Sequence, residues 1–252
     1  MAELQQAKHA LTKWQDIQRV SATFRAGDGT ALSALVAALV DEHPFVRWLA
    51  GKSLAQSAVG IGRLREVLIG GSADAQAAAA DAFLYAGSGD AGVLVSVLSS
   101  QDALVRQSAV EALMRKRHHQ LAPHLGKLMG DPDPWVRRAA AAAAGHLGER
   151  SHVQMLVTLL RDESFLVRRS AAYALGALRA NVAVESLMPA LNDDDAGVRR
   201  NAAWSLGRIG ARTALTQLKA LSKDAALDGD VAAEAERAVA AIEKPSWWKR
   251  LR

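Results

Sequence analysis

The chain has 252 residues, of which half are apolar and 23% are charged, so it has enough apolar material for a folded core and is not a disordered chain. It contains no cysteine, which excludes disulfides, zinc–thiolate sites and cysteine nucleophiles. The 31 Lys and Arg residues outnumber the 26 Asp and Glu residues, and the resulting net charge of +5 is a mild bias toward acidic partners.

Residues 1–30 are predicted to form a capping helix that covers the first of the repeats that follow. Their apolar side chains recur at helical spacing, at Leu4, Ala7, Leu11, Trp14 and Ile17. The N-terminus has no basic start followed by an apolar stretch, and no apolar run in the chain is long enough to span a bilayer. We therefore expect a cytoplasmic protein.

Residues 31–244 contain an internal repeat. The dipeptide Val-Arg recurs every 31 residues in its last four copies, and one degenerate copy, Ala75-Gln76, lies between the first two; the intact copies are Val46-Arg47, Val105-Arg106, Val136-Arg137, Val167-Arg168 and Val198-Arg199. About seven repeats fit this segment. A unit of this length cannot bury its apolar face alone, but stacked copies can. The sequence therefore predicts an all-α fold, an α-solenoid that forms a right-handed superhelix of about seven helical hairpins.

Each repeat reads as two short helices joined by a capped turn. Leu156 and Leu160 give one apolar stripe on a first helix, and Val167, Ala171 and Leu175 give the buried stripe of the second helix. The residue that precedes the second helix is suited to an N-cap in four repeats, at Asp102, Asp133, Ser164 and Asp195. Two glycines, Gly148 and Gly210, are placed to end second helices.

The segment Asp162–Gly176 reads Asp-x-x-x-x-Val-Arg-x-x-Ala-Ala-x-Ala-Leu-Gly and resembles HEAT-like repeats of the phycobilisome (PBS) lyase type. The resemblance covers roughly residues 31–244. Repeats of this type occur in enzymes, adaptors and cofactor chaperones, so they indicate an architecture more closely than a function. In HEAT repeats the Asp and the Arg six residues later form a structural ladder between adjacent turns. The resemblance implies that role for Asp41, Asp131, Asp162 and Asp193 with Arg47, Arg137, Arg168 and Arg199.

The free face of each second helix differs between repeats and is the candidate binding surface. In the first half this face is mixed and partly acidic, with Phe45, Trp48, Lys52, Asp74, Asp81, Leu104, Gln107 and Glu111. In the second half it is basic and aromatic and has no acidic residue. Arg, Trp and Tyr dominate binding hot spots. The predicted partner-binding residues are therefore Trp135, Arg138, Arg169, Tyr173, Arg200, Trp204 and Arg208, with Trp48 from the first half. The alternative is that these aromatic rings pack over arginine stems and only stiffen the groove.

The sequence predicts no catalytic residue, no cofactor and no metal. Five histidines fall within a short segment, at His118, His119, His124, His146 and His152. Deoxyhypusine hydroxylase, another HEAT-repeat protein, binds iron through His-Glu dipeptides, and this chain has none. A phosphate-binding glycine loop and a Gly-x-Ser-x-Gly motif are also missing. We therefore expect a protein that is not an enzyme.

The repeat stops before the final segment, residues 245–252, which carries Trp247 and Trp248 beside Lys and Arg residues. Tryptophan with basic residues is typical of interfacial peptides, but a segment this short binds membranes weakly. We expect these tryptophans either to cap the last repeat or to dock on a partner.

Three functions are compatible with these features. The leading hypothesis is an adaptor or assembly factor that binds an acidic protein segment or an anionic cofactor on its concave face. The alternative, implied by the resemblance, is a phycobilin lyase-like or chromophore-chaperone subunit, in which Arg138 and Arg169 hold the propionates of a tetrapyrrole. The third is nucleic-acid binding, as in a DNA-glycosylase family built from HEAT-like repeats. It is less favoured because that family diverges from the Val-Arg consensus that this chain keeps.

Overall fold

The computed structural model describes residues 2–25, 28–86, 91–224 and 229–243. Within these ranges every regular element is an α-helix or a 3₁₀ helix, which confirms the predicted all-α fold. The chain divides into two compact units, residues 1–121 and 122–252. Trp247 and Trp248, for which the sequence left two roles open, lie outside the described residues.

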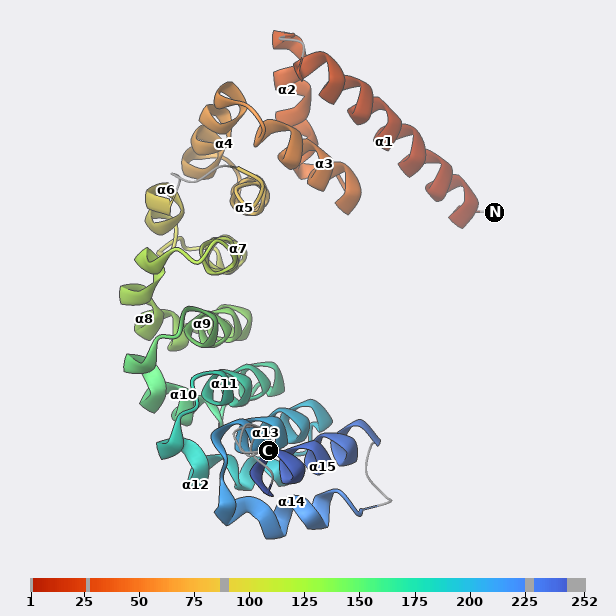
Figure 1. Cartoon of the computed structure of the whole chain (residues 1–252). Coiled ribbons are helices and arrows are strands. Elements are labelled where there is room, and N and C mark those ends of the chain that lie inside the picture. Colours follow the sequence, from red (N-terminus) through yellow and green to blue (C-terminus); the bar gives the residue numbers. More distant parts are fainter. Residues whose placement is uncertain (1, 26–27, 87–90, 225–228, 244–252) are drawn as a thin grey trace, which may run out of the picture. The chain divides into compact units, whose positions relative to one another are not determined.

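Unit 1 consists of helical hairpins and one long N-terminal helix. Its elements are α1 (Ala2–Arg25), α2 (Gly29–Ala37), η1 (Ala38–Val40), α3 (Pro44–Leu54), α4 (Ala58–Gly70), α5 (Ala73–Ala82), α6 (Ala91–Ser96) and α7 (Ala103–Arg115). Helices α2 and α3, α4 and α5, and α6 and α7 pack as pairs, and α5 contacts both α3 and α7 (Figure 1). The second helices of the hairpins thus form one layer within this unit.

Helix α1 packs against α2 and α3 through its C-terminal part. The Ser21 hydroxyl lies 2.7 Å from that of Ser53 on α3, and Phe24 is buried. Of the predicted apolar stripe, Trp14 and Ile17 are half-buried and Leu11 is 55% exposed. The side chains of Leu4 and Ala7 lie outside the described part of the structure.

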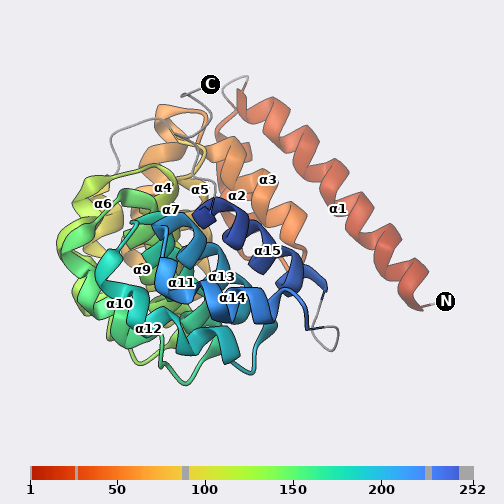
Figure 2. The same cartoon turned by 60° about the horizontal axis from the view of Figure 1, so that its bottom comes forward.

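Unit 2 repeats the hairpin four times within its described residues. After η2 (His119–His124), its elements are α8 (Leu125–Met129), α9 (Pro134–Leu147), η3 (Arg150–His152), α10 (Val153–Leu159), α11 (Phe165–Ala177), η4 (Asn181–Ala183), α12 (Val184–Leu187), η5 (Pro189–Asn192), α13 (Ala196–Ile209), η6 (Arg212–Ala214), α14 (Leu215–Leu221) and α15 (Gly229–Glu243). Helices α9, α11, α13 and α15 contact one another in succession and form the second-helix layer (Figures 1 and 2). This serial packing is that of an α-solenoid.

Most of the predicted capping residues act as caps. The side chains of Asp102, Asp133 and Asp195 accept hydrogen bonds from backbone N–H groups in the first turns of α7, α9 and α13. Ser164 occupies the same position before α11, but its side chain makes no capping hydrogen bond. Helices α9 and α13 end at left-handed glycines, as predicted, with φ of 77° and 82° at the residues Gly148 and Gly210.

Close approach of the second helices requires glycine at a fixed repeat position. A Cβ atom at Gly145 on α9 would lie 2.9 Å from the Ala174 Cα on α11, and one at Gly207 on α13 would lie 2.8 Å from the Ala238 Cα on α15. Real Cβ atoms do not approach backbone atoms this closely, so a side chain at either position would push the helices apart.

The Asp–Arg ladder predicted from the HEAT resemblance is present in unit 2, and its ion pairs join successive repeats. Arg137 donates from Nε and Nη2 to the Asp162 carboxylate over 2.8 and 2.9 Å. Arg168 does the same to Asp193 over 2.7 and 2.8 Å. The aspartate six residues before each arginine contributes its backbone carbonyl instead, as Asp131 does to Arg137 Nη1 at 2.9 Å. Each of these two arginines therefore binds the turn of its own repeat and the corresponding turn of the next repeat.

Candidate functional site

Seven of the predicted partner-binding residues lie on the second-helix layer of unit 2, and we call them the aromatic–arginine face. They are Trp135 and Arg138 on α9, Arg169 and Tyr173 on α11, and Arg200, Trp204 and Arg208 on α13. The rings of Tyr173 and Trp204 stack across the two helices, with centroids 4.8 Å apart and planes 12° apart. Tyr173 is 40% exposed, so the stacked pair is open to solvent on α11.

Arginine side chains lie over the aromatic rings of this face. The Arg138 guanidinium is 5.4 Å from the centre of the Trp135 ring, and that of Arg208 is 5.0 Å from the centre of the Trp204 ring. Such cation–π contacts hold the long arginine side chains in place. Arg200 and Arg208 are exposed, so their charges face the solvent beside the stacked rings.

The structure corrects the expectation that this face has no acidic residue. Arg169 Nη2 donates to both carboxylate oxygens of Asp195, at 3.0 and 3.1 Å. Arg200 Nη1 lies 3.9 Å from the Asp230 carboxylate on α15. Asp195 is the N-cap of α13. The sequence-based expectation considered only residues within the helices, so it did not include this cap. Stacking nevertheless brings this cap opposite the arginine of the preceding repeat.

Trp48, the remaining predicted residue, belongs to unit 1 and lines a pocket there. Its indole N–H donates to the Tyr85 hydroxyl at 2.9 Å, and the two rings meet edge to face with centroids 6.3 Å apart. The Lys52 ammonium lies 4.7 Å from the centre of the Trp48 ring. Both aromatic residues are 43% exposed.

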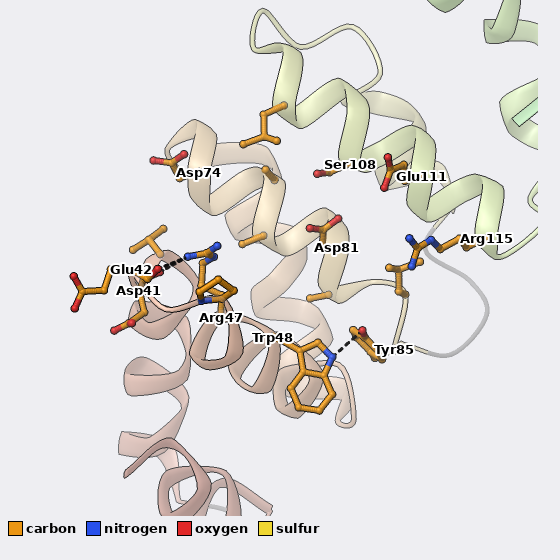
Figure 3. A pocket seen from close by; sticks show the side chains of 18 residues that line it. Asp41, Glu42, Arg47, Trp48, Asp74, Asp81, Tyr85, Ser108, Glu111 and Arg115 are labelled. Atoms are coloured by element: carbon orange, nitrogen blue, oxygen red, sulfur yellow. Dashed lines mark hydrogen bonds between the residues drawn. The ribbon is translucent and has the colours of Figure 1, made fainter. Parts of the chain in front are cut away.

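The pocket has a volume of about 660 Å³ and is formed by α3, α5, α7 and their adjoining turns. Asp81 on α5 and Ser108 and Glu111 on α7 face the same space, with Trp48 and Tyr85 at one side (Figure 3). Its volume lies within the ~300–1,000 Å³ typical of ligand pockets. It is therefore a candidate site as well as the aromatic–arginine face.

The carboxyl group of Asp81 is unusually basic for an aspartate. Its side chain is exposed at the pocket, but neighbouring protein removes part of its hydration, and this raises its pKa to about 6, with repulsion from Glu111 acting in the same direction. A hydrogen bond from Ser108 and the charges of Arg115 and Arg47 oppose the increase without cancelling it. The pocket thus holds two carboxyl groups that repel each other.

At another part of the pocket the charges are already compensated. Lys13 on α1 lies 3.2 Å from the Asp41 carboxylate and 2.9 Å from that of Glu42. Arg47 uses its Nη1 group to bind the carbonyl oxygens of the same two residues, at 2.7 and 3.0 Å. The other acidic side chains that line the pocket are those of Asp74, Asp81 and Glu111.

Sequence reasoning placed Asp81 and Glu111 on the free face of their helices but did not assign them to a site, and it missed Tyr85, Ser108 and Arg115. A signal was available in the repeat register. Asp81 and Glu111 occupy the same position of the repeat, six residues after the Val of the Val-Arg dipeptide or after the Ala that replaces it. Tyr173 and Trp204 occupy this position in their own repeats. Residues at this position meet their equivalents on the neighbouring second helix.

Among the residues that the structure describes, no group of three or more His, Asp and Glu side chains could hold a metal ion. The His152 ring instead lies 3.2 Å from the carbonyl oxygen of Ala122. None of the described helices is both long and apolar enough to cross a membrane.

Comparisons with known proteins agree with the repeat architecture. The family of HEAT repeats matches residues 61–144, 90–176, 122–196 and 153–240, which together cover more than half of the chain. None of the curated proteins matches the sequence.

Solved structures similar to the chain include the Escherichia coli protein YibA, with 17% identity over 84% of this chain and 92% of that one and a TM-score of 0.67. The complex of CpcE and CpcF of phycocyanin lyase from Nostoc sp. PCC7120 shows 22% identity over 84% and 94% of the two chains, with a TM-score of 0.51. An engineered protein shows 22% identity over 90% and 71%, with a TM-score of 0.60. At these identities the likeness concerns the fold.

Proposed function

The chain belongs to the HEAT-repeat family, and from this we propose that it is a non-catalytic adaptor whose aromatic–arginine face holds an acidic segment of a partner protein. The observation that carries the proposal is the stacked Tyr173–Trp204 pair with Arg200 and Arg208 exposed beside it. Aromatic rings and arginines supply contact area and bidentate pairing with carboxylates, and they dominate protein-binding hot spots.

An acidic peptide suits this face better than a nucleic acid does. Asp195 and Asp230 lie next to Arg169 and Arg200. A phosphate backbone would bring closely spaced negative charges against these two carboxylates. A peptide can space its own carboxylates to reach the arginines and lay its apolar side chains on the Tyr173–Trp204 pair. The phycocyanin lyase neighbour is itself a complex of two chains, which supports a protein partner.

Site-specific photo-crosslinking in the producing cell tests the proposal. A photoreactive phenylalanine analogue at Tyr173 should crosslink to a defined partner. The matched position is Val182, which is exposed on η4 of the same unit. The crosslink should fall about tenfold in Arg200→Gln/Arg208→Gln, because carboxylate pairing is lost. It should persist in Arg161→Gln/Arg212→Gln, which removes the same charge at two other exposed positions.

The partner's crosslinked segment should be rich in Asp and Glu, as mass spectrometry of the crosslinked peptide can establish. Equal crosslinking from the Tyr173 and Val182 positions would contradict the proposal. So would crosslinking that is unaffected by the Arg200→Gln/Arg208→Gln change while both variants melt like the parent.

A lyase-like or chromophore-handling subunit is the second candidate, and the flat stacked pair favours it. Two nearly parallel rings offer a surface for a planar tetrapyrrole, and the nearby arginines could bind its propionates. Titration with phycocyanobilin tests this candidate. If the chain is such a subunit, the bilin absorbance should change saturably on addition of the protein, and the affinity should be lower in Arg200→Gln/Arg208→Gln. A bilin spectrum unchanged by the protein would rule this candidate out.

A further inference from the structure

The pocket of unit 1 is not used by the function proposed for unit 2. All the residues that line it belong to residues 40–115, within unit 1. Its lining differs from the aromatic–arginine face because carboxyl groups, and not aromatic rings, occupy the position that meets its equivalent on the next helix. Asp81 and Glu111 replace the Tyr173–Trp204 pair at this register.

The electrostatics around Asp81 favour a positively charged occupant. Asp81 forms no ion pair with any Lys or Arg among the described residues, although the charges of Arg115 and Arg47 lower its pKa. The neighbouring Ser108 on α7 is a neutral, buried side chain that lines the same pocket. A cation placed between Asp81 and Glu111 would replace the lost hydration and remove the repulsion between the two carboxyl groups.

The aromatic side of the pocket suits the same ligand. The hydrogen bond between Trp48 and Tyr85 fixes the two rings at right angles, with both partly open to the pocket. Lys52 already lies over the Trp48 ring, so this ring accepts a cation within the protein itself. The volume of about 660 Å³ exceeds that of one side chain and leaves room for neighbouring peptide backbone.

We propose that this pocket binds an extended protein segment through a Lys or Arg side chain, which inserts between Asp81 and Glu111 while the adjoining backbone lies against Trp48 and Tyr85. The chain then has a site for a basic segment in unit 1 that is separate in its residues from the site for an acidic segment in unit 2.

A capped pentapeptide, acetyl-Gly-Gly-Arg-Gly-Gly-amide, is the probe, and the same peptide with citrulline in place of Arg is its neutral counterpart. Binding to the full isotope-labelled chain is followed by NMR through the indole N–H signal of Trp48. The arginine peptide should give a saturable shift, and the citrulline peptide should bind at least about tenfold more weakly because it lacks the charge. Equal affinities for the two peptides would overturn the proposal.

The variant Asp81→Asn keeps the shape of the side chain and removes its charge. It should weaken binding of the arginine peptide about tenfold, whereas Glu66→Gln, an equal charge loss on α4 outside the pocket, should leave it unchanged. Melting curves establish that the variants are folded, and Glu111→Gln serves as the second pocket variant. If Asp81→Asn and Glu111→Gln both fold and bind like the parent, the pocket does not recognise the cation.

The affinity should also depend on pH. Protonation of Asp81 near pH 6 removes half of the proposed carboxylate pair, so binding should weaken as the pH falls from about 7.5 to about 5. The charged groups that face Asp81 are Arg47 from α3 and Glu111 and Arg115 from α7. The decrease should be smaller in Asp81→Asn. An equal decrease in that variant would exclude Asp81 as the titrating group.

The two proposals fail independently. Arg200→Gln/Arg208→Gln changes only unit 2 and should leave the pentapeptide affinity at the parent value. The pocket variants should in turn leave the crosslink from the Tyr173 position intact.

Discussion

Among single residues, the carboxylate of Asp193 accepts three hydrogen bonds from two neighbouring groups. It accepts two hydrogen bonds from Arg168, at 2.7 and 2.8 Å, and one from the backbone N–H of Asp195, at 2.9 Å. Asp193→Asn should lower the free energy of unfolding by ~1.5–3 kcal/mol, the usual loss for charge-assisted hydrogen bonds. Denaturant unfolding measures this loss. Asp194→Asn, at the exposed neighbouring position, is the control and should change stability little.

The same carboxylate makes stability depend on pH. Partial burial by itself would raise the pKa of Asp193, but the hydrogen bonds from Arg168 and from the Asp195 N–H outweigh it, so the pKa lies below its ordinary value. Its contribution is therefore complete above the pKa of the unfolded chain and is lost as the pH falls through the lower folded value. Asp193→Asn should lose this contribution, so the stabilities of variant and parent should converge in acid. A difference that stays constant into acid would contradict the pairing.

The ladder also indicates how much a single sequence can reveal about contacts. The motif predicted that these aspartates and arginines form a structural ladder between adjacent turns, but it did not specify the partner of each side chain. The ion pairs join residues 25 positions apart, as Arg137 and Asp162 do. Spacing along the chain does not fix which of two equivalent partners is nearer once the repeats stack.

At the element scale, the repeat register specifies which residues of neighbouring second helices meet. Tyr173 and Trp204 were predicted as partner-binding residues on the free faces of their helices, and the structure stacks their two rings on each other. Because equivalent positions on adjacent helices face one another, this contact could have been derived from the 31-residue period. The position of Asp195 opposite Arg169 could not, because it depends on the path of the turn before α13.

Helix packing in unit 2 should be sensitive to one methyl group. Gly145→Ala on α9 would place its Cβ 2.9 Å from the Ala174 Cα and should lower stability by ~1–3 kcal/mol through overpacking. Gly62→Ala on α4 adds the same methyl group where no atom lies within 4 Å, so it should raise stability by ~0.5–1 kcal/mol through helix propensity. Thermal unfolding of both variants compares them. A stabilising Gly145→Ala would show that the α9–α11 contact is looser than the structure indicates.

At the scale of the whole molecule, the fold was predictable and the pocket was not. A fixed period with apolar stripes identifies a stack of hairpins because each hairpin must bury the same face. The pocket depends on Asp81, Glu111, Trp48 and Tyr85 coming from three successive hairpins, one of which has lost the Val-Arg consensus. A repeat consensus describes what the repeats share, whereas this site is formed where they differ.

The ladder is not the same in the two units, and this should be visible in local stability. The position 25 residues after Arg47 is Ser72, whereas the positions 25 residues after Arg137 and Arg168 are the ladder aspartates. Arg47 donates to backbone carbonyls of its own turn as the other ladder arginines do, but Ser72 offers no carboxylate, so no such pair joins α3 to α5. In a linear array each interface contributes separately, so the α3–α5 interface should open more easily than α9–α11.

Native-state hydrogen exchange measures that difference helix by helix. Core amides of α3 should have opening free energies ~1–2 kcal/mol below those of α11, since one charge-assisted pair is missing. Arg137→Gln removes the corresponding pair in unit 2 and should bring the protection of α11 close to that of α3. Equal protection of α3 and α11 in the parent chain would mean that apolar packing, and not the ladder, determines how firmly successive repeats hold together.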